Sequence, residues 1–406
     1  MHECRICGNQ YKPFISFGPQ PIANGFEDPG RSPSSYRFEL QVGFCGSCLM
    51  VQLIDQPEPE QMFHGEYAFF SSTSRLMDEH FRQFHEYIDK NHLGRSNPFV
   101  VEMGSNDGIM LKYFAEKGVR HLGIEPSANV ARVATESGIN TLVAFFNVET
   151  ARQIVSEHGQ ADVFYSANVM CHIPYMHSIA SGILELLRPE GVLIFEDPYL
   201  GDVLRLNSYD QIYDEHVFLF SVGSVRNLFG KYDLELIDVQ PQDTHGGSMR
   251  YVLGRTGVHS VSTRVGIQVR LEEEMGLYVP DTYVRFCERV EQSRRELVAL
   301  LRDIRSQGKR VVGYGATSKS TTVLNYCGIG PDLVEFVCDT TPIKQGKLTP
   351  GSGIPVRPYE EFSRQFPEYA LLFAWNHSKE IMAKEGNFAR AGGQWILYVP
   401  DVYVNS

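Results

Sequence analysis

Apolar residues recur along the middle of the chain in two alternating patterns. Short unbroken runs rich in Val, Ile and Phe are typical of buried parallel strands, whereas apolar residues spaced every three or four positions are typical of helices. The patterns predict strands over 99–103, 119–125, 140–143, 161–168 and 191–196, and helices over 77–87, 109–114, 129–137 and 176–187. Strands that alternate with helices in this way form an open, doubly wound parallel sheet.

The last third of the chain repeats this organisation. Apolar positions at helical spacing predict a largely helical segment over 265–306. A strand then begins at Arg310, and further strands are predicted over 334–339, 369–375 and 395–399. We therefore expect a second α/β unit in the C-terminal part of the chain.

The first 60 residues carry two Cys-x-x-Cys pairs, Cys4 with Cys7 and Cys45 with Cys48. Two such turns supply four thiolates for one tetrahedral ion, which is the ligand set of a structural zinc site. Redox pairs usually occur singly in a thioredoxin-like context, and four thiolates leave no open position for a catalytic metal. The four cysteines therefore predict one structural zinc ion.

The first strand of the central unit ends in a glycine turn. Glu102 lies near the strand end, Gly104 and Gly108 punctuate the turn, and Asp107 precedes the second glycine. A strand, a glycine turn and a helix start form a ligand crevice at the carboxyl edge of a sheet. The spacing is not the dinucleotide pattern Gly-x-Gly-x-x-Gly. The carboxylates of Glu102 and Asp107 disfavour a negatively charged pyrophosphate. They suit a ligand with a cationic sulfonium and a ribose, and S-adenosylmethionine has both.

Other predicted strand ends bring polar side chains to the same edge. Glu125 ends the second strand and is positioned to accept hydrogen bonds from ribose hydroxyls. Asn168 ends the strand over 161–168, and His172 follows shortly after it. Because the carboxyl ends of parallel strands meet at one edge, we expect these residues to share the crevice.

An insertion after the last of these strands concentrates Tyr213, Glu215 and His216, which we expect within one helical turn of one another. A histidine beside a carboxylate in an apolar setting is suited to act as a general base. An ordinary buried histidine bonded to the backbone is the alternative, and the residues alone leave both open. Tyr67, in an aromatic and hydroxyl-rich segment, is either a core or lid tyrosine or a hydroxyl donor in the site.

A second glycine turn opens the C-terminal α/β unit. Gly313 and Gly315 follow a strand, and Ser318 and Lys319 come at the start of the next helix. A helix N-terminus with hydroxyl donors and one cation favours a phosphate group. The turn lacks the Walker spacing, so it does not predict an NTPase.

The composition restricts the partners. The 406 residues include 37 Lys and Arg against 49 Asp and Glu, a net charge of −12, which argues against nucleic acid as the main partner. No run of about 18 apolar residues occurs, and the N-terminus lacks the features of a signal peptide. We expect a cytoplasmic protein without a membrane partner.

The order of motifs along the chain resembles a known family. The motifs are the two Cys-x-x-Cys pairs, Tyr67-x-x-x-Ser71-Ser72-x-Ser74, Glu102-x-Gly104-x-x-Asp107-Gly108, Asn168-Val-Met-x-His172-Ile173, Tyr213-x-Glu215-His216, His245-Gly-Gly-Ser248 and Gly313-Tyr-Gly315-Ala-x-x-Lys319. They resemble the S-adenosylmethionine-dependent C-methyltransferases of deoxysugar biosynthesis in antibiotic producers. The resemblance covers essentially the whole chain and is greatest to the C-3 methyltransferases of TDP-4-keto-deoxyhexoses, of the tetronitrose-pathway type.

The resemblance implies an α/β protein of three domains. A zinc-binding domain is expected over 1–75 and a doubly wound class I methyltransferase domain over 76–255. A Rossmann-like domain over 256–406 is expected to help bind a TDP-linked keto-deoxysugar. We also expect a monomer.

Roles for individual residues follow from the same resemblance. His216 is expected to remove the C-3 proton, and Tyr213, Glu215, His172 and Tyr67 to orient this base or donate to the enolate oxygen. The residues expected to bind S-adenosylmethionine are Glu102, Gly104, Asp107, Gly108, Glu125 and Asn168. Those expected to bind the nucleotide sugar are Ser71, Ser72, His245, Gly315, Ser318 and Lys319.

Four other functions are compatible with parts of this pattern. A nucleotide-sugar dehydrogenase needs a dinucleotide glycine motif at the first strand, and an RNA methyltransferase needs a basic face; both features are missing. Methylation at C-5, or a bifunctional enzyme that also reduces the ketone, stays open. The sequence also leaves open whether C-3 of the sugar bears an amine or a hydroxyl.

Overall fold

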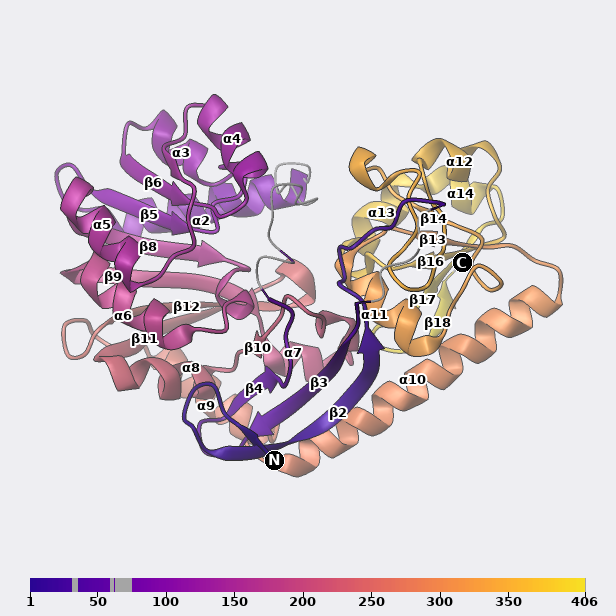
Figure 1. Ribbon diagram of the computed structural model, residues 1–406, viewed down its shortest axis with the longest axis horizontal. Coiled ribbons are helices and arrows are strands. Elements are labelled where there is room, and N and C mark those ends of the chain that lie inside the picture. Colours follow the sequence, from indigo (N-terminus) through magenta and orange to yellow (C-terminus); the bar gives the residue numbers. More distant parts are fainter. Residues whose placement is uncertain (31–35, 59–61, 63–74, 406) are drawn as a thin grey trace.

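The computed structural model describes residues 1–30, 36–58, 62 and 75–405. These residues form three β-sheets together with α-helices, which confirms the predicted α/β class. In Figure 1 the N-terminal sheet (indigo) and the long helix α10 (Pro280–Ser306) run between the central unit (purple to pink) and the C-terminal unit (orange to yellow). The domain boundaries expected after residues 75 and 255 stay predictions.

The first sheet is antiparallel, with the strand order β1-β2-β3-β4-β10. Its strands are β1 (His2–Glu3), β2 (Gln10–Gln20), β3 (Phe38–Cys45), β4 (Met50–Leu53) and β10 (Phe218–Leu219). Strand β10 comes from far along the chain, because Phe218 pairs with Gln52 and Leu219 with Val51. This non-local pairing brings the insertion that carries His216 beside the cysteine-bearing strands.

The central sheet has the strand order β11-β12-β9-β8-β5-β6-β7. Strands β7, β6, β5, β8 and β9 are parallel, and β12 is antiparallel to both β9 and β11. The bounds are β5 (Phe99–Met103), β6 (Arg120–Ile124), β7 (Thr141–Leu142), β8 (Ala161–Ala167), β9 (Leu187–Pro198), β11 (Leu234–Gln242) and β12 (Ser248–Arg255). The prediction of a doubly wound sheet is therefore confirmed, and the strand over 99–103 has the predicted bounds.

Helices cover this sheet and connect its strands. The α-helices are α2 (Arg75–His92), α3 (Leu111–Glu116), α4 (Ala128–Glu136), α5 (Val148–His158), α6 (Met176–Leu186), α7 (Leu200–Arg205) and α8 (Val222–Phe229). Short 3₁₀ helices are η2 (Met170–His172), η3 (Tyr209–Gln211), η4 (Gly230–Tyr232) and η5 (Thr244–Gly246). The insertion around Tyr213–His216 is η3 followed by a turn and strand β10, and the turn keeps Tyr213 and His216 close together, with the N–H of His216 donating to the carbonyl oxygen of Tyr213.

Helix α2 is fixed over the end of β9 by a buried ion pair. The Nε2 atom of His80 and the Nε atom of Arg250 each lie 2.6 Å from a carboxylate oxygen of Glu196. Burial opposes the charge on Glu196, but Arg250 and His80 lower its pKa below the ordinary value. The guanidinium of Arg250 also lies 4.0 Å from the ring centre of Phe84 on α2.

The single helical segment predicted over 265–306 is two helices, α9 (Thr263–Glu274) and α10. Gly276 at φ +73° ends the first, and Pro280 begins the second, as the conformational preferences of these residues favour. The described helices, α10 included, contain none that is long and apolar enough to cross a membrane.

The C-terminal sheet has the order β15-β14-β13-β16-β17-β18, parallel except for the last pair. Its strands are β13 (Val311–Tyr314), β14 (Val337–Cys338), β15 (Val356–Arg357), β16 (Tyr369–Leu372), β17 (Gln394–Leu397) and β18 (Tyr403–Asn405). Its helices are α11 (Ser318–Cys327), α12 (Tyr359–Arg364), α13 (Ser378–Lys384) and α14 (Gly386–Arg390), with η6 (Pro342–Lys344) and η7 (Trp375–His377). The expected second α/β unit is thus observed.

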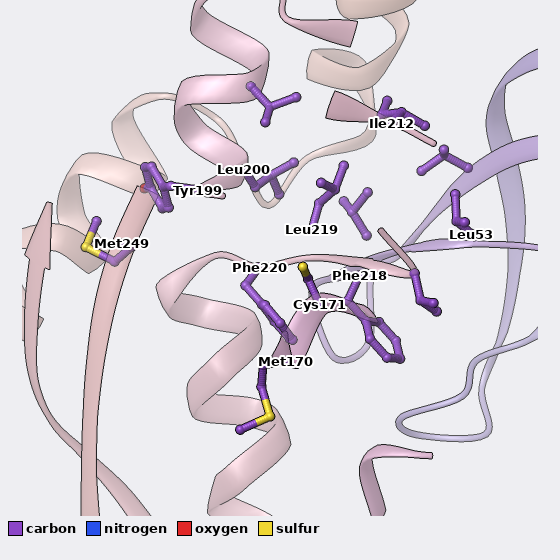
Figure 2. Close-up of a cluster of buried hydrophobic side chains, with 14 of the residues drawn as sticks. Leu53, Met170, Cys171, Tyr199, Leu200, Ile212, Phe218, Leu219, Phe220 and Met249 are labelled. Carbon is purple, nitrogen blue, oxygen red and sulfur yellow. The ribbon is translucent and has the colours of Figure 1, made fainter. Parts of the chain in front are cut away.

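A buried apolar cluster lies between the first and central sheets. Figure 2 shows Phe218 and Phe220 close to Met170 and Cys171, with Leu53 of β4 nearby. His172 follows Cys171 in sequence, and His216 lies two residues before Phe218. Packing of this cluster therefore holds the two backbone segments that carry these histidines.

Candidate active site

A cavity of about 340 Å³ lies between the central and C-terminal units. Glu125 and Asn168 line it from strand ends of the central sheet, and Tyr213 and His216 line it from the insertion. Lys319 lines it from α11 of the C-terminal unit. The cavity thus brings together side chains that the sequence assigned to a cofactor, a base and a second substrate.

One wall of the cavity has the features of a nucleoside site. Glu125 accepts hydrogen bonds from the backbone N–H groups of Asn106 (3.1 Å) and Ser127 (2.8 Å). Burial raises the pKa of this carboxyl group, and the two N–H donors oppose that shift. Gly104 has φ +70°, and a Cβ atom there would lie 2.3 Å from a methyl carbon of Val169. Only glycine fits this close approach of the turn to the segment after β8.

Three residues that the sequence assigned to cofactor binding lie beside the cavity instead. As far as the chain is described, the cavity wall does not include Glu102, Asp107 or Gly108. Glu102 is buried in β5 and accepts a hydrogen bond of 2.9 Å from the hydroxyl of Tyr165. Burial raises the pKa of Glu102 well above its ordinary value. Glu102 lies within β5, and Asp107 and Gly108 lie in the turn that follows it.

The insertion holds His216 in one tautomer. The Nδ1 atom of His216 lies 2.7 Å from the carbonyl oxygen of Gln211. A carbonyl oxygen only accepts hydrogen bonds, so Nδ1 carries the proton and Nε2 is the acceptor. The hydroxyl of Tyr213 donates to Nε2 over 2.9 Å. Burial, reinforced by the nearby His172, lowers the pKa of His216 well below its ordinary value, so the ring is neutral.

Strained backbone accompanies several polar residues of the cavity. Asn106, Asn168 and His245 line it with φ values of +48°, +55° and +55°, which residues other than glycine rarely adopt. The Nδ2 atom of Asn168 lies 2.5 Å from the Nε2 atom of His245. The close approach of these two side chains joins the end of β8 to η5 at the cavity wall.

The C-terminal unit contributes a buried cation to the cavity. Thr317 caps α11 by accepting a hydrogen bond of 3.2 Å from the N–H of Ser320, which leaves Ser318 and Lys319 facing the cavity. The Nζ atom of Lys319 lies 5.2 Å from the ring centre of Trp375. Burial lowers the pKa of Lys319, and the carboxyl group of Asp210 opposes the shift. Gly315 is not one of the described residues that line the cavity. Its φ of +88° allows the turn before α11.

Several cavity residues escaped the sequence reasoning. Asn24, from the segment between β2 and β3, and Lys344, from η6, both line the cavity, as do Asn376 and His377. Asn24 lies in a stretch rich in Gly and Pro that carries no periodic signal, and Lys344 lies in a loop. Only their three-dimensional neighbours identify them. Tyr67, Ser71 and Ser72 lie outside the described residues.

The four cysteines of the N-terminal region form a compact sulfur cluster. Cys4 Sγ lies 3.5 Å from Cys48 Sγ, Cys7 Sγ lies 3.5 Å from Cys45 Sγ, and all four sulfur atoms lie within 4.8 Å of one another. The side-chain amide of Gln52 donates to Cys4 Sγ over 3.0 Å. These separations, and an N–H donor to a thiolate, fit one tetrahedral zinc ion.

A second group, Cys171, His172 and His216, also brings three metal-ligating atoms within 4.8 Å. Both ring nitrogens of His216 are already engaged, Nδ1 with Gln211 and Nε2 with Tyr213. A metal ion would have to break one of these bonds, and Cys171 belongs to the apolar cluster of Figure 2. Hydrogen bonding and packing account for this group without a metal.

Comparisons with known proteins decide the family. Family models match successive parts of the chain: "Putative zinc binding domain" over 4–63, "Methyltransferase domain" over 75–239 and "C-methyltransferase C-terminal domain" over 243–400. C-methyltransferase NovU from Streptomyces niveus is 35% identical over 407 aligned residues, which cover 100% of this chain and 97% of that protein. The chain belongs to the C-methyltransferase family. It is an S-adenosylmethionine-dependent methyltransferase with an N-terminal zinc module, which confirms the resemblance and both predicted cofactors.

More distant similarities are confined to part of the chain. Ubiquinone biosynthesis O-methyltransferase from Acinetobacter baylyi is 26% identical over 139 residues, which cover 31% of this chain and 58% of that protein. Among solved structures, a SAM-dependent methyltransferase from Anabaena variabilis aligns with a TM-score of 0.35 and 17% identity, covering 43% of this chain and 84% of that one.

Proposed function

We propose that this C-methyltransferase methylates C-3 of a TDP-linked 4-keto-deoxysugar. The observation that carries the proposal is the neutral His216, which lines the cavity with its proton on Nδ1 and its acceptor nitrogen bonded to Tyr213. Glu125 and Lys319 line the same cavity from different units. The base thus lies between a wall suited to a nucleoside, which carries Glu125, and a wall that carries the cation of Lys319. This arrangement suits C-methylation beside a ketone.

The proton is the first group to move. A ketone at C-4 acidifies the C-3 hydrogen, and Nε2 of His216 accepts this proton while the C–H electron pair delocalises onto the C-4 oxygen. The hydroxyl of Tyr213, which donates to Nε2 in the free protein, then turns to donate to the enolate oxygen. When bound, S-adenosylmethionine supplies the methyl group, as an electrophile on its sulfonium sulfur. C-3 takes the methyl group as the ketone re-forms.

The remaining assignments belong to the same proposal. Gly104, Glu125 and Asn168 contact the cofactor, and Glu102, Asp107 and Gly108 support that wall. His245, Ser318 and Lys319 face the nucleotide sugar, and Gly315 shapes their turn. The roles of Tyr67 in catalysis and of Ser71 and Ser72 in substrate binding are predictions from the sequence. His172 and Glu215 orient the base. The TDP carrier, the monomeric state and the cytoplasmic location are predictions from the sequence.

Labelled substrates test the proposal directly. The enzyme is incubated with a TDP-4-keto-6-deoxysugar and S-adenosylmethionine labelled in its methyl group, and the product is analysed by NMR. A labelled methyl carbon bonded to C-3 is expected. A signal at C-5, the other carbon beside the ketone, would overturn the regiochemistry, and the absence of any labelled sugar would overturn the substrate class. A carbinol at C-4, formed only when a nicotinamide cofactor is supplied, would indicate additional ketoreduction.

A further inference from the structure

The segment between β2 and β3 leaves the zinc-bearing sheet and reaches the loop that carries the base. The backbone N–H of Ala23 donates to Oδ2 of Asp214 over 3.0 Å. The side-chain amide of Asn24 donates to Oε1 of Glu215 over 2.7 Å. Two adjacent donors of one segment therefore meet two adjacent carboxyl groups of the other, immediately before His216.

Helix α11 holds both segments from the opposite side. The hydroxyl of Thr321 donates to the carbonyl oxygen of Ala23, and the hydroxyl of Thr322 donates to the carbonyl oxygen of Ile212, each over 2.9 Å. Both threonines are buried. Consecutive residues of α11 thus bind the N-terminal segment and the base-bearing loop, within one helical turn of Lys319 in the cavity wall.

The two carboxyl groups depend on these donors because they are buried. Burial raises the pKa of Asp214 to about 7 and that of Glu215 to about 8, and Asp214 adds to the shift of Glu215. Asn24 and the ammonium group of Lys344 oppose it, and the thiol of Cys171 also interacts with Glu215. A buried carboxyl group that loses its donor is destabilised, so the loop would move to recover a partner.

We propose that Asn24 is a positioning residue, through which the zinc-bearing sheet holds Glu215 and hence the Tyr213–His216 pair in the cavity wall. This inference rests on the proposed role of His216. The zinc module then contributes to catalysis although its metal ion supplies no chemistry there. The contact needs a hydrogen-bond donor at position 24, because Oε1 of Glu215 is the acceptor.

Two substitutions at one position test the inference. Asn24→Ala removes the donor, and Asn24→Asp keeps the shape but sets a second acid against Glu215. We expect Asn24→Ala to lower kcat by about 10- to 100-fold, the scale of a small misplacement of catalytic groups, with the affinity for S-adenosylhomocysteine within about twofold of wild type. Asn24→Asp should be as impaired at pH 8, but its activity relative to wild type should rise as the pH is lowered, because the two facing carboxyl groups then hold a proton that one of them donates to the other. Asn387→Ala and Asn387→Asp, at an exposed position on α14, are the matched controls.

Hydrogen exchange separates this inference from the proposed function. Without substrate, amides of residues 209–217 should exchange faster in Asn24→Ala than in wild type, while those of β5 and β13 are unchanged. Unchanged exchange of 209–217, or a pH-independent ratio between Asn24→Asp and wild type, would overturn the positioning role even if the wild-type enzyme methylates the keto-sugar. Faster exchange with no methylation by wild type would overturn the proposed substrate and leave the contact established.

Discussion

The imidazole rings of His172 and His216 are stacked, with their centroids 5.3 Å apart and an interplanar angle of 23°. Burial lowers the pKa of His172 to about 4. Burial and the neighbouring His172 lower the pKa of His216 well below its ordinary value. Because burial disfavours the protonated form of each ring, both rings are neutral near pH 7, and His216 is in the form that accepts a proton.

This arrangement predicts the pH dependence of turnover. A lowered pKa keeps the base in its active, neutral form as the pH falls, so kcat should stay constant through about pH 6.5, the ordinary pKa of histidine, and decrease only at lower pH. Methyl transfer is measured from pH 5 to pH 8 with both substrates saturating. An acid limb centred near pH 6.5 would contradict the neutral, buried base.

Removal of the base should abolish proton transfer while both ligands still bind. His216→Gln is expected to lower kcat by about 10²–10⁴-fold, the usual contribution of a general base. In deuterated water with S-adenosylhomocysteine bound, wild type should exchange deuterium into C-3 of the keto-sugar, and His216→Gln should not. Exchange in His216→Gln at the wild-type rate would move the base to His172.

Tyr213→Phe should retain deuterium exchange at a reduced rate, since only the donor to the enolate oxygen is lost.

The nucleoside wall is tested through Glu125. Its carboxylate is oriented by the N–H groups of Asn106 and Ser127, so Glu125→Ala should weaken cofactor binding by about 1–3 kcal/mol through lost hydrogen bonds to a charged acceptor. Isothermal calorimetry with S-adenosylhomocysteine measures this loss. Glu190→Ala, at an exposed position of β9, is the control and should bind normally. An unchanged dissociation constant in Glu125→Ala would contradict the cofactor assignment.

The cationic wall is tested through Lys319. Since its ammonium group is the charge that α11 brings to the cavity, Lys319→Ala should raise the KM of the nucleotide sugar and leave cofactor affinity unchanged. Steady-state kinetics and calorimetry separate the two effects, with Lys379→Ala, on the exposed part of α13, as the control. A fall in kcat at unchanged KM would instead assign Lys319 to stabilisation of the enolate.

Local sequence patterns were sufficient where the structure depends on local preferences. Strand 99–103 and the turn at Gly104 followed from a β-branched run and a glycine, and the four cysteines were identified by their spacing. The break between α9 and α10 was missed, although Gly276 and Pro280 are visible signals, because the apolar period continues across them.

The missing parts of the site depend on non-local contacts. Strand β10 pairs with β4, a distant part of the sequence, and this pairing places the segment around His216 beside the first sheet. Asn24 reaches the cavity only because α11 and the base-bearing loop hold its segment. No periodicity or spacing within residues 21–30 carries that information, so propensity alone cannot predict these contacts.

Zinc removal should affect the fold first and catalysis through it. The four clustered cysteines, Cys4, Cys7, Cys45 and Cys48, form no disulfide. As thiolates they would repel one another, so a bound metal ion is needed to hold them together. We expect one zinc ion per chain by metal analysis, and Cys45→Ser should lose the ion and lower the thermal midpoint of unfolding. Cys287→Ser is the matched control, because Cys287 lies outside the cluster and a serine there can still donate to the carbonyl oxygen of Phe14.

Loss of the ion should also lower kcat, because β4 pairs with β10, which begins two residues after His216. Metal-free protein with unchanged stability would contradict a structural role for zinc.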